Sequence, residues 1–198
     1  MIYLVLFLGL AGCDELFGND KGDGGGDDSE TESTSSPGDD SGTTNPTDAE
    51  FCDQRLSSAP PGGPDCQTGT LVCGDSVTGT TEGGLSQLGG SSYLDWFCDP
   101  TPDAYAGPER VYLFVMEGRG QATVTLESPC VDLDLMVMHY GDEANCPSPG
   151  AGISECEASE KSGVDTVVVS AFERYAFYVV VDGKNGNTGN YRLSVSCD

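Results

Sequence analysis

Basic residues are scarce in this chain. Its 198 residues include 8 Lys and Arg against 33 Asp and Glu, which gives a formal net charge of −25. Acidic side chains occur both before and after residue 50. Because a phosphate backbone is repelled by such an excess of carboxylates, the composition excludes nucleic acid as a partner. Divalent cations and basic surfaces remain compatible with it.

Groups for acid–base and metal chemistry are equally scarce. His139 is the one histidine, no serine follows the nucleophile-elbow pattern, and no Cys-x-x-Cys pair is present. A hydrolytic triad needs a histidine beside a nucleophile, and a zinc site needs several His or Cys ligands. A redox-active dithiol uses the Cys-x-x-Cys spacing. The sequence therefore predicts a noncatalytic protein without a transition metal, with His139 at the edge of the core.

Hydrophobic runs of transmembrane length are missing too. The apolar run from Ile2 to Gly12 is shorter than the about 20 residues of a spanning helix, but it suits a secretory signal. At its end, Leu10-Ala11-Gly12-Cys13 resembles the lipobox of bacterial lipoproteins, whose cysteine receives a diacylglycerol. We expect residues 1–12 to be a signal peptide and the lipid on Cys13 to be a membrane anchor. The alternative is that residues 1–12 are part of a transmembrane anchor and Cys13 is an ordinary cysteine.

A polar linker follows Cys13. Residues 14–50 consist mainly of Gly, Ser, Thr, Asp and Glu, and the large hydrophobic residues among them are Leu16 and Phe17. Such a segment cannot bury enough apolar surface to offset its conformational entropy. We therefore expect residues 13–50 to be a lipidated cysteine with a disordered tether, and residues 51–198 to be the folded domain.

The folded domain has the pattern of an all-β protein. Short apolar segments recur with turn residues between them, and no stretch keeps a helical period. Two of them join at Gly118–Gly120, where we expect a tight hairpin. The pattern predicts an antiparallel sandwich with one core between its sheets. The expected strands are 71–73, 76–80, 111–117, 121–127, 131–139, 164–170, 175–181 and 191–197.

The strand predicted at 131–139 alternates between two faces. One face carries apolar side chains only, and we assign that face to the core: Val131, Leu133, Leu135 and Val137. The other face carries Asp132, Asp134, Met136 and Met138.

Residues 107–197 contain the stretches GPERVYLFVMEGRGQATVTLESPCVDLDLMVM and YAFYVVVDGKNGNTGNYRLSVSC. These two stretches resemble the bacterial pre-peptidase C-terminal domain family. The resemblance implies a jelly-roll-like β-sandwich that is usually noncatalytic and often appended to secreted proteases. No protease accompanies it here, so the resemblance favours a display or binding module.

Calcium is the one metal that the sequence leaves open. Asp132 and Asp134 lie two positions apart on one expected strand face, and some collagen-binding relatives in the family use calcium. The alternative is that both carboxylates bond loop amides or face water. Residues 182–189 look like a calcium loop, but Lys184 and Gly186 stand where oxygen ligands are needed, which favours a hairpin loop. We expect no cofactor other than this calcium.

Aromatic residues gather before Cys98. Tyr93, Trp96 and Phe97 would suit a sugar or peptide platform if exposed, but small disulfide-rich domains also pack aromatic side chains over their cystines. We favour the packing role for this cluster.

Nine cysteines favour an oxidising compartment, and removing Cys13 leaves an even number. We expect structural disulfides among Cys52, Cys66, Cys73, Cys98, Cys130, Cys146, Cys156 and Cys197. Eight cysteines allow 105 pairings. Proximity in sequence favours Cys146 with Cys156, and then Cys73 with Cys98, Cys52 with Cys66, and Cys130 with Cys197.

These features lead to one expected function and two alternatives. We expect a monomeric, noncatalytic lipoprotein of the bacterial cell envelope, at the outer membrane or cell surface, which binds an unknown extracellular or periplasmic ligand. The first alternative is a calcium-dependent adhesin that binds matrix protein or polysaccharide. The second is a hydrolase with an unrecognised site.

Overall fold

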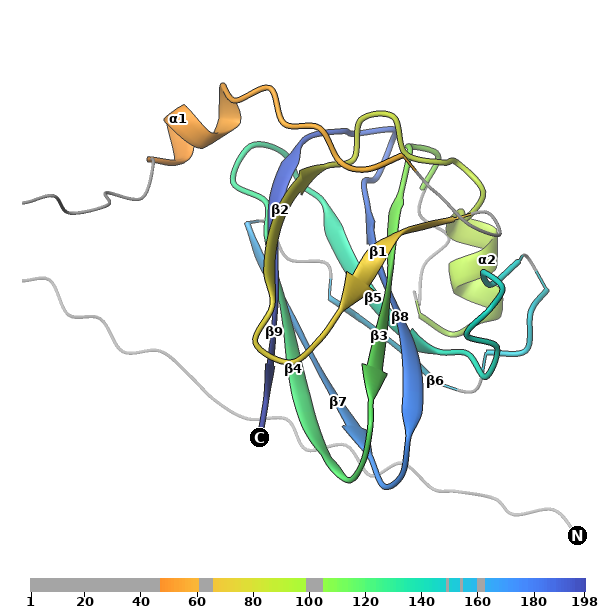
Figure 1. Ribbon diagram of the computed structural model, residues 1–198. Coiled ribbons are helices and arrows are strands. Elements are labelled where there is room, and N and C mark those ends of the chain that lie inside the picture. Colours follow the sequence, from red (N-terminus) through yellow and green to blue (C-terminus); the bar gives the residue numbers. More distant parts are fainter. Residues whose placement is uncertain (1–46, 61–65, 99–104, 149, 154, 160–162) are drawn as a thin grey trace, which may run out of the picture. The chain divides into compact units, whose positions relative to one another are not determined.

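The computed structural model describes residues 47–60, 66–98, 105–148, 150–153, 155–159 and 163–198 (Figure 1). The predicted signal peptide, Cys13 and nearly all of the tether lie outside these residues. Among the described residues, no helix is long and apolar enough to cross a membrane. The elements are α1 (Asp48–Cys52), β1 (Gln67–Leu71), β2 (Ser76–Thr80), α2 (Gly90–Asp95), β3 (Arg110–Met116), β4 (Gly120–Glu127), β5 (Asp134–His139), β6 (Glu155–Ser159), β7 (Val164–Ala171), β8 (Tyr175–Asp182) and β9 (Asn190–Cys197).

The strands form two facing sheets, as the sequence predicted. Sheet A has the order β1-β3-β8-β5-β6, and sheet B has the order β2-β9-β4-β7. Every neighbouring pair is antiparallel except β1 with β3, which is parallel. Most predicted strands match, but the one expected at 71–73 shares only Leu71 with β1, and β5 begins at Asp134 and not at residue 131. The sequence pattern did not indicate β6 or the two short helices.

The two predicted hairpins are wrong. The connection from β3 to β4 and the connection from β8 to β9 each lead from sheet A to sheet B. Two-residue hairpin turns require a positive φ, which neither Gly118 nor Gly120 has. The first connection therefore spans the two layers of the sandwich, and so does the loop at 182–189.

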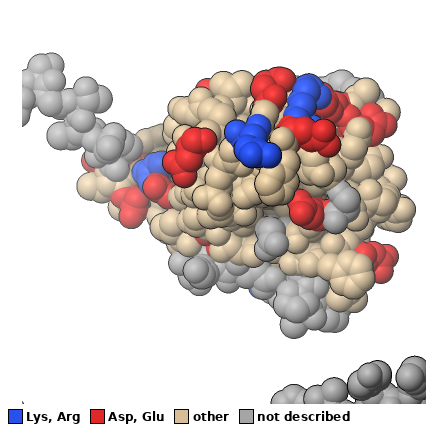
Figure 2. Space-filling view, turned by 90° about the horizontal axis from the view of Figure 1, so that it is seen from below, with Lys and Arg blue, Asp and Glu red and all other residues tan. Residues whose placement is uncertain are grey.

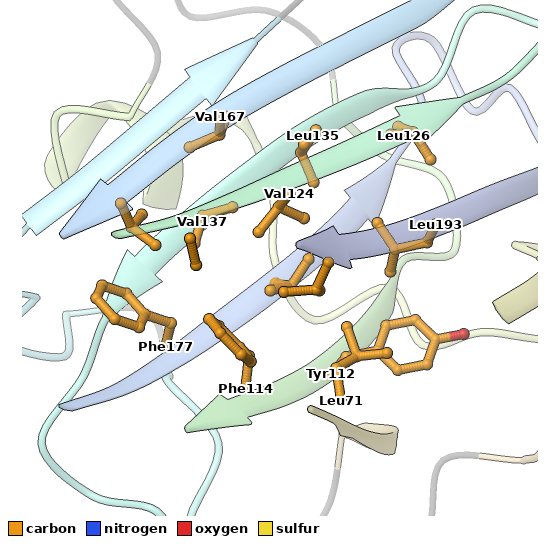
Figure 3. Packing of buried hydrophobic residues seen from close by; sticks show 14 of the residues in the cluster. Leu71, Tyr112, Phe114, Val124, Leu126, Leu135, Val137, Val167, Phe177 and Leu193 are labelled. Carbon is orange, nitrogen blue, oxygen red and sulfur yellow. The ribbon is translucent and has the colours of Figure 1, made fainter. Parts of the chain in front are cut away.

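The main core lies between the two sheets. On β7, buried and exposed residues alternate strictly, and the buried Val167 and Val169 belong to this core. Figure 3 shows side chains from the two sheets pointing toward one another. The predicted core residues Leu133, Leu135 and Val137 are fully buried here, and Val131 packs against them partly buried.

A second core covers the opposite face of sheet A, which the sequence analysis did not predict. Met136 and Met138 of β5, assigned to the non-core face, are fully buried with Tyr178 of β8. Tyr93 and Trp96, from α2 and the residue after it, pack against them. A short helical segment thus buries a sheet face whose mixed polar and apolar pattern suggested exposure.

The described part of the chain begins with a short helix that is capped at its N-terminus. Thr47 caps α1 with a capping box, because its side chain accepts from the amide of Glu50 and its own amide donates to that carboxylate. The side chain of Asn190 donates to the carbonyls of Phe51 and Gln54. These bonds attach the N-terminal segment to the first residue of β9.

The eight cysteines form four disulfides, but each predicted pairing is wrong. The bonds join Cys52 to Cys130, Cys66 to Cys146, Cys73 to Cys197 and Cys98 to Cys156. Their sequence separations run from 58 to 124 residues. Proximity in sequence failed as a guide because the sandwich brings distant segments together, and longer closed loops remove more entropy from the unfolded chain.

Candidate binding surface

The two predicted calcium residues lie in different environments. Asp132 is exposed in the loop before β5, whereas Asp134 is the first residue of that strand and is buried. The hydroxyl of Tyr105 donates to Asp134 Oδ2 at 2.7 Å, and Lys184 Nζ lies 3.8 Å from the same oxygen. The expectation that both carboxylates share one strand face is therefore wrong, because the strand starts after Asp132.

Asp134 instead belongs to a buried layer of carboxylates and tyrosines beneath α2. It pairs across the sheet with Asp182 of β8, which accepts a bond from the hydroxyl of Tyr93 at 2.8 Å and one from the amide of Gly183 at 2.7 Å. The rings of Tyr93 and Tyr105 meet edge to face at 5.1 Å. Each tyrosine thus ties the segment before β3 to one acid of sheet A.

Burial is the main cause of the raised pKa values in this layer. It raises the pKa of Asp182 to about 7 and that of Asp134 to about 6, although the tyrosine hydrogen bonds oppose the change. Repulsion from the carboxyl group of Glu109, and then from that of Asp134, adds to the increase in the pKa of Asp182. The described residues contain no group of three or more His, Cys, Asp or Glu side chains arranged to hold a metal ion. The geometry indicates a structural role for this layer.

His139 lies where the sequence predicted, at the edge of the main core. Its ring stacks on Tyr175 with the centroids 4.0 Å apart, and it also contacts Phe177. This histidine therefore packs among aromatic rings at the end of β5.

The aromatic cluster before Cys98 divides into two parts. Tyr93 and Trp96 are buried in the second core with Cys66 and Cys98, so the predicted packing role holds for them. Phe97 is 90% exposed and has a φ of 60°. The prediction of a packing role is wrong for this residue.

The outer face of sheet B is a plane of hydroxyl groups with almost no charge. We call it the hydroxyl face; its Ser and Thr residues are Ser76, Thr78, Thr123, Thr125, Thr166, Ser170, Ser194 and Ser196. Their neighbours Val124, Val167 and Val195 point into the main core, which places the hydroxyl groups outward.

One row of the hydroxyl face crosses the whole sheet. Ser76 pairs with Ser194, Ser194 with Thr125, and Thr125 with Thr166. The charged residues at outward positions on these four strands are Arg192 and Glu127, which form an ion pair at 3.3 Å at one end of the face.

Sheet B ends at β7, where two exposed valines stand beside the outward Thr166 and Ser170. The side chains of Val164 and Val168 are 52% and 48% exposed. Phe172, the residue just after the strand, is 81% exposed. The guanidinium of Arg119 lies 5.6 Å from the centroid of the Phe172 ring. The strand expected at 164–170 is confirmed, but its sequence gave no indication that it forms an edge.

A slot of about 240 Å³ opens between β7 and sheet A. Its lining residues are Val137, Glu155, Val168, Val169, Ser170, Phe172 and Phe177. Val137 and Phe177 belong to the main core, so the slot gives access to the interior of the sandwich.

A larger hollow of about 640 Å³ lies beside the N-terminal segment. The Cys52–Cys130 disulfide, Arg55, Glu82 and Asn190 are among its lining residues. Its lining is mostly polar.

Figure 2 shows the end of the sandwich where β3 connects to β4 and β7 connects to β8. Every basic side chain in this view lies beside acidic ones, and uncharged surface separates these groups. Arg174, in the connection from β7 to β8, contacts Glu117 and Glu143. Its charge is therefore compensated locally.

No family model and no curated protein matches this chain. Among solved structures, it is similar to the pre-peptidase C-terminal domain of a collagenase from Bacillus anthracis, with 12% identity and a TM-score of 0.40 over 73% of this chain and 100% of that one. It is also similar to PliG from Aeromonas hydrophila, a periplasmic inhibitor of g-type lysozyme, with 12% identity and a TM-score of 0.37 over 65% of this chain and 96% of that one. At this level of similarity, neither structure indicates what this chain binds.

Proposed function

We propose that this protein is a noncatalytic binding module anchored at the bacterial cell envelope through a lipid on Cys13. The lipobox Leu10-Ala11-Gly12-Cys13 and the acidic tether after it support the anchor. The four disulfides fit an oxidising compartment outside the cytoplasm. The tether gives the folded domain freedom to reach a partner while the lipid holds it at the membrane.

The hydroxyl face is the observation that carries the binding function. The chain has 33 acidic residues, yet the outward positions of these four strands hold Glu127 and no other acid. Interfaces between proteins are depleted of charge at their centres, because charged groups lose their hydration there. A flat face without charge on a strongly acidic protein therefore suits contact with a partner surface.

Photochemical crosslinking in the native cell tests this binding function. A photoreactive amino acid replaces Thr125, at the centre of the hydroxyl face, or Ser57, an exposed residue outside sheet B, as the matched control. We expect a reproducible adduct from position 125 that Thr166→Lys suppresses, and none from position 57. Equal adducts from both positions, or none from position 125, would contradict the proposed binding face.

Two further measurements test the anchor and the noncatalytic character. Mass spectrometry of the native protein should show an acylated Cys13 at the mature N-terminus, and Cys13→Ser should release the protein from membranes. An unmodified chain with residues 1–12 intact would contradict the anchor.

A screen with esterase, protease and glycosidase substrates should detect no turnover, and any activity that copurifies with the folded protein would contradict the noncatalytic assignment.

A further inference from the structure

From Val167 to Ala171, the edge of sheet B at β7 lacks the residues that usually prevent pairing with another chain. β4 pairs with all eight residues of β7, and no other described strand in sheet B lies beside it. The strand contains no Lys, Arg or Pro, and its register with β4 is continuous. Proteins normally protect exposed edges with such residues or with bulges, because the unpaired amides and carbonyls are a template for another strand.

Only part of this edge is open. Near its start, the carboxylate of Asp165 is buried and accepts a bond from Ser159 of β6 at 2.8 Å. An inward charge and a neighbouring strand both protect an edge. The other half, from Val167 to Ala171, leads to the exposed Phe172 and borders the slot.

The slot has the size for one side chain, and core residues form its floor although Glu155 and Ser170 make part of its wall polar. Its volume of about 240 Å³ lies below the range of about 300–1,000 Å³ that is usual for sites of drug-sized ligands. Its floor consists of core residues, including Val137 and Phe177, and its rim includes Phe172. A strand beside β7 would direct alternate side chains toward the interior, where one of them would reach the slot.

Charge around the slot favours a basic partner. Glu155 lines the slot and Glu173 follows Phe172, and both are exposed. Of the nearby arginines, Arg174 contacts carboxylates and Arg119 lies over the Phe172 ring. The net charge of −25 also attracts basic partners from a distance.

From these observations we infer that β7 binds an extended peptide segment of another protein by strand addition along residues 167–172. The segment carries apolar side chains at alternate positions, with one in the slot, and basic residues at its ends. This inference rests on the proposed binding function and names the partner class. A second copy of the chain is disfavoured because both copies carry the same large negative charge. Leu16 and Phe17 are disfavoured because they follow Cys13 closely, and the proposed lipid on Cys13 would keep them near the membrane.

The test uses the full-length protein in detergent and the synthetic peptide Lys-Thr-Val-Thr-Leu-Thr-Val-Lys. Two further peptides have the same sequence, with N-methyl groups either on the amides of the apolar residues or on those of the threonines. Because neighbouring amides of a strand point to opposite sides, one methylated peptide should bind like the parent. The other should bind about tenfold more weakly or worse, since it loses several main-chain hydrogen bonds. Equal affinity of all three peptides, or no binding of the parent, would overturn the inference.

Protein variants locate the binding to the edge. Val168→Lys adds a charge on β7, and Gln121→Lys adds the same charge on the neighbouring strand β4, which is paired on both sides. We expect about tenfold weaker peptide binding for the first variant and unchanged binding for the second. Bound peptide should also slow hydrogen exchange of alternate amides between Val167 and Ala171. Equal loss in both variants would show a purely electrostatic contact and overturn the inference.

Control measurements distinguish the proposed peptide from the other possible occupants of the edge at β7. Dimers whose β7 amides are protected without peptide would assign the edge to a second copy and overturn the inference. Faster exchange of these amides in the double variant Leu16→Ser/Phe17→Ser would assign the edge to the tether and would also overturn the inference. If the adduct at position 125 persists while no peptide binds, the proposed binding function stands and the inference fails. If that adduct is absent while the peptide binds at β7, the hydroxyl face is the part that fails.

Discussion

Asp134 on β5 lies directly opposite Asp182 on β8, and both carboxyl groups are buried. Each accepts a hydrogen bond from a different tyrosine, Tyr105 or Tyr93. Two acids in this arrangement are costly when both are ionised, because burial and mutual repulsion each oppose the charge. The pair therefore makes the stability of the domain depend on pH.

We expect the protein to be more stable at pH 5 than at pH 8. The pKa values of Asp134 and Asp182 rise from a usual 3.8 to about 6 and about 7 in the folded state. Between pH 4 and pH 7 the folded state thus binds more protons than the unfolded state, so the free energy of unfolding falls as the pH rises. Asp182→Asn should remove on the order of 2 kcal/mol of this difference, as measured by urea unfolding at both pH values.

Asp132→Asn is the matched control for this prediction. It removes the same charge from an exposed position in the neighbouring loop and so changes the net repulsion equally. Its pH dependence should stay close to that of the wild type. If the two variants lose the same amount, general charge repulsion accounts for the effect, and the buried pair does not.

The sequence predicted the buried Asp134 as a site residue, together with the exposed Asp132, for a reason that the structure does not support. The alternation in 131–139 was correct for Leu133, Leu135 and Val137, because a sheet face with only apolar residues has one plausible environment. It could not show that α2 covers the other face. That cover comes from residues more than thirty positions upstream, and no local pattern marks Tyr93 and Tyr105 as partners of the acids.

The candidate binding surface was harder to predict than the fold. Short apolar segments between turn residues predicted β4 and β7, but the hydroxyl face forms only when β2, β9, β4 and β7 align side by side. The order of strands depends on which connections cross between sheets, and short loops such as Gly118–Gly120 suit a hairpin or a crossing equally well in sequence. For the same reason, the sequence did not predict that β7 lies at the edge of sheet B.

A close backbone contact at Gly84 should make this residue essential for stability. A Cβ atom there would lie 2.2 Å from the carbonyl oxygen of Glu109, which belongs to the backbone and cannot rotate away. We expect Gly84→Ala to lower the free energy of unfolding by about 1–3 kcal/mol. Gly118→Ala is the control, since nothing lies within 4 Å of its Cβ position, and it should change stability by less than about 0.5 kcal/mol. Thermal unfolding of both variants checks this, and equal effects would refute the close contact.

We expect calcium removal to leave the melting temperature unchanged. Asp132 and Asp134 do not converge, and the ammonium group of Lys184 lies 3.8 Å from Asp134 Oδ2, where it would repel a cation. Melting curves with excess EGTA and with added calcium should therefore superimpose. An increase with calcium that Asp132→Asn abolishes would restore the calcium-dependent adhesin as the better hypothesis.

The disulfide between Cys73 and Cys197 should contribute more stability than the one between Cys98 and Cys156. It closes a loop of 124 residues, against 58 for the other, and joins the turn after β1 to the end of β9. Loop-closure entropy gives an upper limit of about 4 to 5 kcal/mol for each bond and a slightly higher value for the longer loop. Urea unfolding of Cys73→Ser/Cys197→Ser and Cys98→Ser/Cys156→Ser measures the difference. Mass spectrometry of peptides from the unreduced wild type should show these two pairs linked, and a Cys146–Cys156 peptide in their place would contradict the described topology.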